Sequence, residues 1–120
     1  MPLILYIEDN DDNAYMLSGR LEMAGFDVIL AEDGETGVEM ATTQAPDLVI
    51  MDLVLPGIDG LKATHQLRCH EGTRNIPVIA LSSNASTEDR KMSLEAGCND
   101  FDTKPVDFDR LIRKINACLN

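Results

Sequence analysis

Apolar and polar residues follow one another in blocks along this chain, and the blocks predict short strands separated by helices. The apolar run at residues 48–55 is rich in Val, Ile and Leu and broken only by Asp52, which is typical of a parallel strand buried on both faces. Apolar runs at residues 3–7 and 76–81 predict two more strands, and residues 26–31 predict a shorter one. A shorter fifth strand is predicted at residues 100–103.

The segments between these runs carry helical signals. The first predicted helix has Ala14, Leu17, Leu21 and Ala24 on one apolar stripe and stops at Gly25. A weak helix is predicted around residues 38–41, and another from about residue 59 to residue 70, with inward positions at Leu61, Thr64 and Leu67. The pattern therefore places a helix after each of the first three strands.

The two remaining helices differ in quality. A capping box at residues 86–89 starts the fourth helix, which ends at Gly97 and has so few apolar residues that we expect it to be the least firmly docked. The last helix has the best amphipathic stripe in the chain, formed by Phe108, Leu111, Ile112, Ile115 and Leu119.

Five strand–helix units of this kind predict an α/β fold, a doubly wound, five-stranded parallel sheet with helices on both faces. The expected strand order, 2-1-3-4-5, is taken from known folds of this type rather than derived from the sequence. In such sheets, ligands bind beyond the carboxyl ends of the strands. We expect one domain that spans residues 1–120.

Composition narrows the possible partners. Twenty-one acidic and ten basic residues give a formal charge of −11, which argues against nucleic acid as a direct partner. No run of about eighteen apolar residues predicts a membrane span, so we expect a soluble, cytoplasmic protein without a membrane partner. The three cysteines, far apart in sequence, are expected to be reduced thiols.

The most informative polar residues follow the predicted strands. Glu8 and Asp9 come after the first strand, Asp52 ends the third, Ser82 follows the fourth, and Lys104 follows the fifth. Because the carboxyl ends of parallel strands meet at one edge of a sheet, these five side chains are expected to form one site. Three carboxylates in one place repel unless a divalent cation lies among them, and all-oxygen ligands favour magnesium.

A bound magnesium ion, a lysine and a hydroxyl around one further carboxylate are the parts that phosphoryl transfer requires. The cations neutralise the transferring group, and a carboxylate oxygen attacks in line. The pattern therefore predicts that Asp52 accepts a phosphoryl group.

Four segments carry a resemblance to a known family: ILYIEDN, LVIMDLVLPGIDG, PVIALSSNA and GCNDFDTKP, at residues 4–10, 48–60, 77–85 and 97–105. With these motifs the chain resembles, from end to end, a response regulator receiver domain of two-component signalling, similar to chemotaxis receivers. The resemblance implies the flavodoxin-like receiver fold. It also implies that magnesium, or possible manganese, is held directly by Asp9, Asp52 and the backbone carbonyl of Val54, and through water by Glu8.

The resemblance also implies a switch. Asp52 is the implied phosphoacceptor, Ser82 the hydroxyl that moves to bind the phosphoryl group, and Lys104 the lysine that pairs with it. Phe101 stands where the family has a rotating aromatic residue, and Lys104–Pro105 where it usually has a cis peptide. These roles are carried over from the family position by position.

The family tunes hydrolysis of its phosphoryl group at two positions, here Val54 and Asn84. Ser82 stands where Thr is common, which leaves the switch role open to it. We expect apolar Val54 to orient water poorly, so that the phosphoryl group persists.

The expected protein is therefore a phosphorylation-dependent response regulator. A histidine kinase or histidine phosphotransfer protein would supply the phosphoryl group, and the face made by the fourth helix, fifth strand and fifth helix would signal to a downstream protein. It is not expected to be an enzyme, beyond promoting its own phosphotransfer and dephosphorylation.

Two alternatives remain beside this interpretation. Asp9 and Asp11 after a first strand also resemble the motif of haloacid-dehalogenase-type phosphatases, although the chain lacks their cap and much of their length. The second alternative is an interaction module that works without phosphorylation. A module of that kind would not need Asp9, Asp52, Ser82 and Lys104 together.

Overall fold

The computed structural model describes residues 1–83 and 86–120 and contains five strands that alternate with five helices in that part of the chain. The strands are β1 (Leu3–Ile7), β2 (Asp27–Ala31), β3 (Leu48–Asp52), β4 (Val78–Ser82) and β5 (Asp100–Thr103). The helices are α1 (Asp11–Met23), α2 (Gly34–Gln44), α3 (Gly60–Cys69), α4 (Thr87–Ala96) and α5 (Phe108–Leu119).

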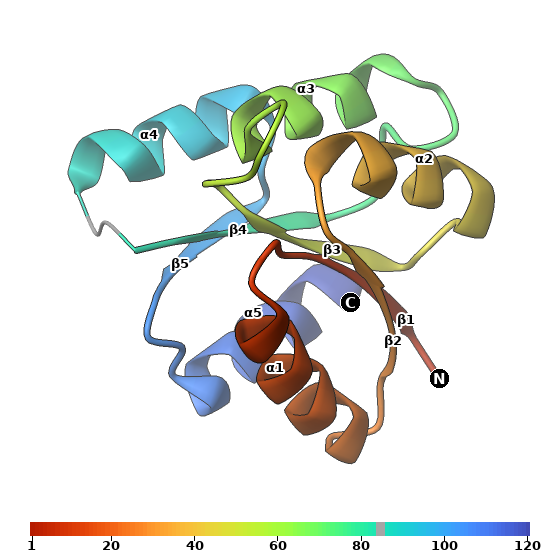
Figure 1. Ribbon diagram of the computed structural model, residues 1–120, viewed down its shortest axis with the longest axis vertical. Helices are drawn as coiled ribbons and strands as arrows, with labels where there is room; N and C mark the ends of the chain where they lie inside the picture. The colour runs from red at the N-terminus through yellow and green to blue at the C-terminus, as the bar shows by residue number, and fades with distance from the viewer. Residues whose placement is uncertain (84–85) are drawn as a thin grey trace.

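All strand pairs are parallel, and the sheet has the order β2-β1-β3-β4-β5. Helices α2, α3 and α4 cover one face of the sheet, and α1 and α5 cover the other (Figure 1). The predicted α/β fold and strand order are confirmed. No helix in residues 1–83 or 86–120 is long and apolar enough to cross a membrane.

The central strands are buried on both faces, as their unbroken apolar runs predict. Every residue of β3 and β4 is buried. Along β1, Leu5 and Ile7 belong to the core under α2 and α3, while Ile4 and Tyr6 belong to the core against α1 and α5. Side chains that alternate across a strand thus supply two separate cores.

The helices mostly bury the residues that the sequence predicts. Helix α1 buries Ala14, Leu17 and Leu21, but it ends at Met23, and Ala24 is exposed. Helix α5 fully buries only Leu111 and Ile115 of its stripe, and the rest is half-buried. Helix α3 buries Ala63, Thr64 and Leu67, whereas Leu61, predicted to point inward, is half-buried.

Helix α4 is the least firmly docked, as predicted. Ser93 is its one buried residue, and its hydroxyl donates to the carbonyl of Asp89 in the preceding turn. Met92 and Leu94 are 44% and 45% exposed. The predicted cap is present, since the Ser86 hydroxyl accepts a hydrogen bond from the Asp89 amide.

Candidate functional site

Asp52 is the last residue of β3, and only 5% of it is exposed. Its Oδ1 accepts a hydrogen bond of 3.1 Å from the amide of Val54. Gly60, at the start of α3, packs so closely on the Asp52 carbonyl that a Cβ there would clash with it. A central strand and a tight turn therefore hold this carboxylate in one place.

Glu8 follows β1 and is also buried, with 3% exposed. Its Oε1 accepts hydrogen bonds from the Tyr6 hydroxyl at 3.0 Å and from Lys104 Nζ at 2.8 Å. Lys104 Nζ also donates to Asp52 Oδ2 at 3.2 Å. One ammonium thus bridges two buried carboxylates that lie 44 positions apart in sequence.

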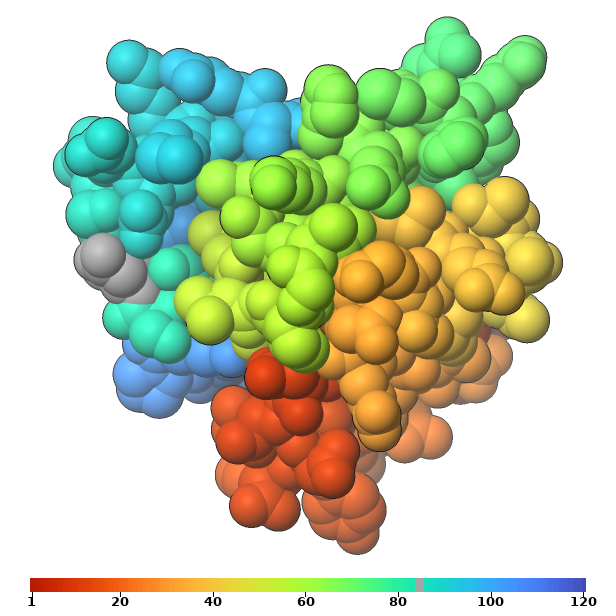
Figure 2. Space-filling view, turned by 45° about the horizontal axis from the view of Figure 1, so that its top comes forward, coloured from red at the N-terminus to blue at the C-terminus, as the bar shows by residue number. Residues whose placement is uncertain are grey.

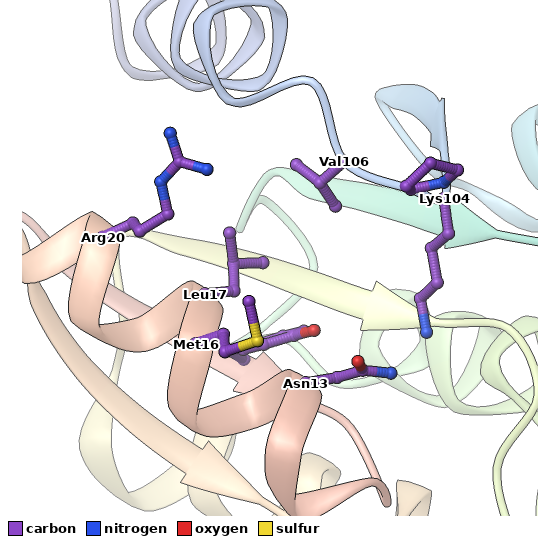
Figure 3. Close-up of a pocket in the computed structure, with 8 residues that line it drawn as sticks. Asn13, Met16, Leu17, Arg20, Lys104 and Val106 are labelled. Carbon is purple, nitrogen blue, oxygen red and sulfur yellow. The ribbon is translucent and has the colours of Figure 1, made fainter.

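The segments that carry these residues come together in space. The segment after β1, in red, lies against the yellow-green segment after β3 in the space-filling view (Figure 2). Lys104 extends from the segment after β5 toward the end of a central strand (Figure 3). The predicted convergence of strand ends is thus present in the fold.

Negative charge is in excess at this edge, because one ammonium, that of Lys104, faces the carboxylates of Glu8 and Asp52. Burial, together with the hydrogen bond and charge of Glu8, raises the pKa of Asp52 to about 6 against the opposing effects of the Val54 amide and Lys104. Burial also opposes ionisation of Glu8, but its hydrogen bonds with Asp52 and Lys104 lower its pKa overall. The carboxylate pair therefore holds one proton more readily than two isolated carboxylates would.

Asp9 adds a third carboxylate, which is exposed. One oxygen each from Glu8, Asp9 and Asp52 can lie within 4.8 Å of one another. Such a set of oxygen ligands with excess negative charge fits a hard divalent cation such as magnesium. Val54 is 72% exposed, and the metal-binding role of its carbonyl stays a prediction.

The predicted switch residues lie close to this edge. Ser82 ends β4 with 4% exposed, and its carbonyl accepts a hydrogen bond from the Lys104 amide. Phe101 in β5 is 3% exposed and packs in the core under α2 and α3. The Lys104–Pro105 peptide is cis, as the resemblance implies. Asn84 lies outside the described residues.

Tyr6 is the residue that the sequence analysis missed. It is 1% exposed, and its ring belongs to the core against α1 and α5 while its hydroxyl binds Glu8. A tyrosine in an apolar strand two residues before a carboxylate was an available signal, because a buried tyrosine hydroxyl needs a partner.

A hollow of about 240 Å³ opens beside Tyr6 and Lys104. Figure 3 shows Asn13, Met16, Leu17 and Arg20 of α1 on one side of it and Val106 with Lys104 on the other. The Lys104 stem thus lines a mainly apolar hollow while its ammonium reaches the carboxylates.

Comparison with known proteins agrees with this geometry. The sequence model of the family described as response regulator receiver domain matches residues 4–116. The protein PilH of Pseudomonas aeruginosa is 40% identical over 119 residues, which cover 99% of this chain and 98% of PilH. The Synechocystis DNA-binding regulator RpaA is 38% identical over 99% of this chain, but the chain spans only 49% of RpaA.

A solved structure gives the same result. The receiver domain of the Pseudomonas aeruginosa sensor histidine kinase PA1611 superimposes with a TM-score of 0.92 at 37% identity, covering 98% of this chain and 97% of that one. That structure has a magnesium ion coordinated in its active site cleft. None of these comparisons supports a haloacid-dehalogenase-type phosphatase, and Asp11, the second aspartate of the resembling motif, is exposed in the first turn of α1.

Proposed function

The chain belongs to the family of response regulator receiver domains, and from this premise we propose that it is a phosphorylation-dependent switch with Asp52 as its phosphoacceptor. The observation that carries the proposal is the position of Asp52. Its buried carboxylate lies beside the carboxylates of Glu8 and Asp9 and 3.2 Å from the Lys104 ammonium.

The transfer itself needs few groups. An Asp52 oxygen attacks the phosphorus of a phosphohistidine in line, and the phosphorus–nitrogen bond breaks as the new phosphorus–oxygen bond forms. The electron pair stays on the imidazole nitrogen, which takes a proton from solvent. Lys104 then turns from its carboxylate partners to the phosphoryl oxygens, which carry up to two negative charges.

Asp9 and Asp52 are the proposed side chains that bind the metal directly, with the Val54 carbonyl as a further ligand and Glu8 acting through water. When bound, magnesium would neutralise negative charge on the transferring phosphoryl oxygens. Manganese shares the preference for oxygen ligands and is proposed as a substitute. Tyr6 holds Glu8 by one oxygen and so fixes its orientation in this set.

The switch would work through a change of packing. In the proposal, Ser82 moves to bind the phosphoryl group, and Phe101 follows into the space that it leaves. Helix α4, which buries only Ser93, is the element that can shift at least cost. Phosphorylation would then shift the population of the α4–β5–α5 face toward a form that a downstream protein reads.

The proposed phosphodonor is a histidine kinase or a histidine phosphotransfer protein. The cytoplasmic location predicted from the sequence is part of the same proposal. The particular partners of the related proteins are not assigned to this chain.

Incubation with acetyl phosphate and magnesium tests the proposal. The intact mass is expected to rise by one phosphoryl group in the native protein and to stay unchanged in Asp52→Asn. Parallel samples with EDTA are expected to gain nothing, and samples with manganese are expected to gain the same mass. A mass gain retained by Asp52→Asn would contradict the role of Asp52.

A phosphorylation-independent module has a different signature. If the mass gain occurs but leaves the amide NMR spectrum of α4, β5 and α5 unchanged, phosphorylation has no effect on the proposed output face. That result would contradict the switch while preserving the phosphoacceptor.

A further inference from the structure

The α4–β5–α5 face contains a second hollow, of about 320 Å³, that is separate from the carboxylate site. Three cationic side chains line it: Arg90 from α4, and Arg110 and Lys114 from α5. The one acidic residue among its lining residues is Asp102 of β5. We call this hollow the cationic pocket.

Buried Asp102 holds the cationic side chains of the pocket in place. It is 3% exposed, and its Oδ1 accepts hydrogen bonds from Arg110 Nε at 2.9 Å and from the Thr103 amide at 2.8 Å. Arg110 NH2 lies 2.7 Å from the same oxygen. The guanidinium is therefore fixed at the pocket, although 38% of its side chain is exposed.

Lys114 and Arg90 complete the pocket differently. Lys114 Nζ donates a 2.6 Å hydrogen bond to the carbonyl of Phe101 and lies 3.7 Å from Asp100 and 3.9 Å from Asp102. Arg90 is exposed, and its guanidinium makes no hydrogen bond or ion pair within residues 1–83 and 86–120. The pocket thus has two cations held in place and one available to a ligand.

This concentration of positive charge is unusual for the chain. The whole sequence has ten basic residues and a formal charge of −11, yet three of the ten line this one pocket. Asp102 and Asp107 pair with Arg110, and Asp100 and Asp102 lie near Lys114, so the charges of these two cations are compensated by the chain itself. Arg90 is the cation of the lining that is left to attract an acidic ligand, which the rest of the molecule repels.

We propose that the cationic pocket binds a carboxylate-rich segment of the downstream protein. The proposal rests on the proposed function, since it names the chemistry of the partner read by the α4–β5–α5 face. Arginine suits this role because its planar guanidinium pairs with a carboxylate through two parallel hydrogen bonds. Arg90 provides this pairing, while Arg110 and Lys114 line the same pocket.

The pocket is also connected to the switch. Lys114 donates to the backbone carbonyl of Phe101, so a switch that shifts the β5 backbone at Phe101 would move one of the three cations. Phosphorylation of Asp52 is therefore expected to change the affinity for an acidic segment rather than to create the site.

Fluorescence anisotropy with a labelled hexaglutamate peptide tests the proposal, with a labelled hexaglutamine peptide as the uncharged control. Native protein is expected to bind hexaglutamate and not hexaglutamine, and more weakly as salt concentration rises. Arg90→Glu is expected to weaken binding at least about tenfold, which is the effect of roughly 1.4 kcal/mol. Arg113→Glu is the matched control, because it makes the same charge change at an exposed position of α5 that does not line the pocket.

Equal losses in Arg90→Glu and Arg113→Glu would overturn the proposal, because only the net charge would then matter. Absence of hexaglutamate binding in both the unmodified and the acetyl-phosphate-treated protein would overturn it as well. A thymidine oligonucleotide is the competing probe, and tighter Arg90-dependent binding of this probe would assign the pocket to nucleic acid instead. Concentration-dependent self-association abolished by Arg90→Glu would replace the downstream protein with a second copy of this chain.

The failure of this proposal can be told from failure of the proposed function. Arg90-dependent hexaglutamate binding without any mass gain at Asp52 would support the proposed cationic pocket and contradict the proposed phosphorylation switch. A normal mass gain with hexaglutamate binding that is insensitive to Arg90→Glu would support Asp52 as the phosphoacceptor and contradict the proposed cationic pocket.

Discussion

Two aspartates at the carboxyl ends of β3 and β5 are almost equally buried, yet their electrostatic surroundings are opposite. Asp52 is 5% exposed and shares the Lys104 ammonium with a second buried carboxylate, Glu8. Asp102 is 3% exposed and has Arg110 at 2.7 Å and Lys114 at 3.9 Å. One aspartate lies where negative charge is in excess, the other where positive charge is.

Burial of an ionised carboxylate is costly unless a cation or hydrogen bonds compensate it. At Asp102 the compensation comes from two cations of the chain itself, and Arg90, in the same pocket, is available to an acidic ligand. At Asp52 one lysine serves two carboxylates, so the site keeps the capacity to take up a metal cation and a proton. The charge balance around an aspartate, rather than its burial, separates a proposed reactive site from a proposed docking site.

The largest expected effect comes from removing the one cation on the Asp52 side. Lys104→Gln should slow phosphoryl transfer from acetyl phosphate on the order of 100-fold, because a charge-stabilising donor beside the transferring group is lost. The rate is measured by intact mass spectrometry over time, with Lys62→Gln on the exposed surface of α3 as the matched control. Equal rates for the two variants would contradict a role for Lys104 in transfer.

The next effect is on stability in EDTA as a function of pH. The pKa of Asp52 is raised from 3.8 to about 6 in the folded protein, so its proton stabilises the fold at acidic pH. This contribution is fully present below about pH 4 and is lost as the pH rises through 6. Glu8, with its lowered pKa, acts in the opposite direction and only at lower pH.

The free energy of unfolding in urea should therefore fall by about 1.4 kcal/mol between pH 5 and pH 8 because of Asp52. Asp52→Asn should lose most of this decline, whereas Asp102→Asn should keep it. A decline of equal size in Asp52→Asn and the native protein would show that another group causes it.

A third experiment compares the two ends of the Asp102 ion pair. Arg110→Met leaves a buried carboxylate with less compensation, whereas Asp102→Asn leaves a guanidinium that solvent reaches. The melting temperature should therefore fall further in Arg110→Met, by an extra few degrees. Scanning calorimetry measures both, and a drop in Asp102→Asn that equals or exceeds the drop in Arg110→Met would contradict the predicted asymmetry.

The smallest expected effect concerns Val54, whose side chain is 72% exposed beside Asp52. Val54→Asn should hasten loss of the phosphoryl group by about fivefold, because an amide can position the attacking water where an apolar side chain cannot. The half-life after removal of acetyl phosphate gives the rate, and Val54→Leu serves as the apolar control. A Val54→Asn half-life no shorter than that of the native protein would contradict the tuning role.

The sequence predicts the Asp52 side of this comparison well. Unbroken apolar runs define β1, β3 and β4, and a charged or hydroxyl residue at the end of each run marks the carboxyl edge. Because parallel strands bring these ends to one edge, the sequence together with the strand order of known folds predicts that Glu8, Asp52 and Lys104 meet.

The Asp102 side could not be predicted in the same way. The segment DFDT has no apolar run that tells which of its acidic residues is buried, and the depth of Asp102 depends on how α5 crosses β5. Helix α4 likewise gave no stripe that identified Ser93 as its buried residue. The sequence also did not reveal that Tyr6 binds Glu8, because strand periodicity gives a direction for a side chain and not its partner.

The bond between Tyr6 and Glu8 has a practical consequence. The chain has no tryptophan and only two tyrosines, one of which, Tyr15, is 81% exposed on α1. The other chromophore is Tyr6, whose phenolic hydroxyl donates a hydrogen bond to Glu8, a carboxylate of the proposed metal site. Ultraviolet difference spectra of the unlabelled protein therefore contain one signal from solvent and one from the carboxylate site, and titration with magnesium should perturb only the second. The protein carries its own optical reporter.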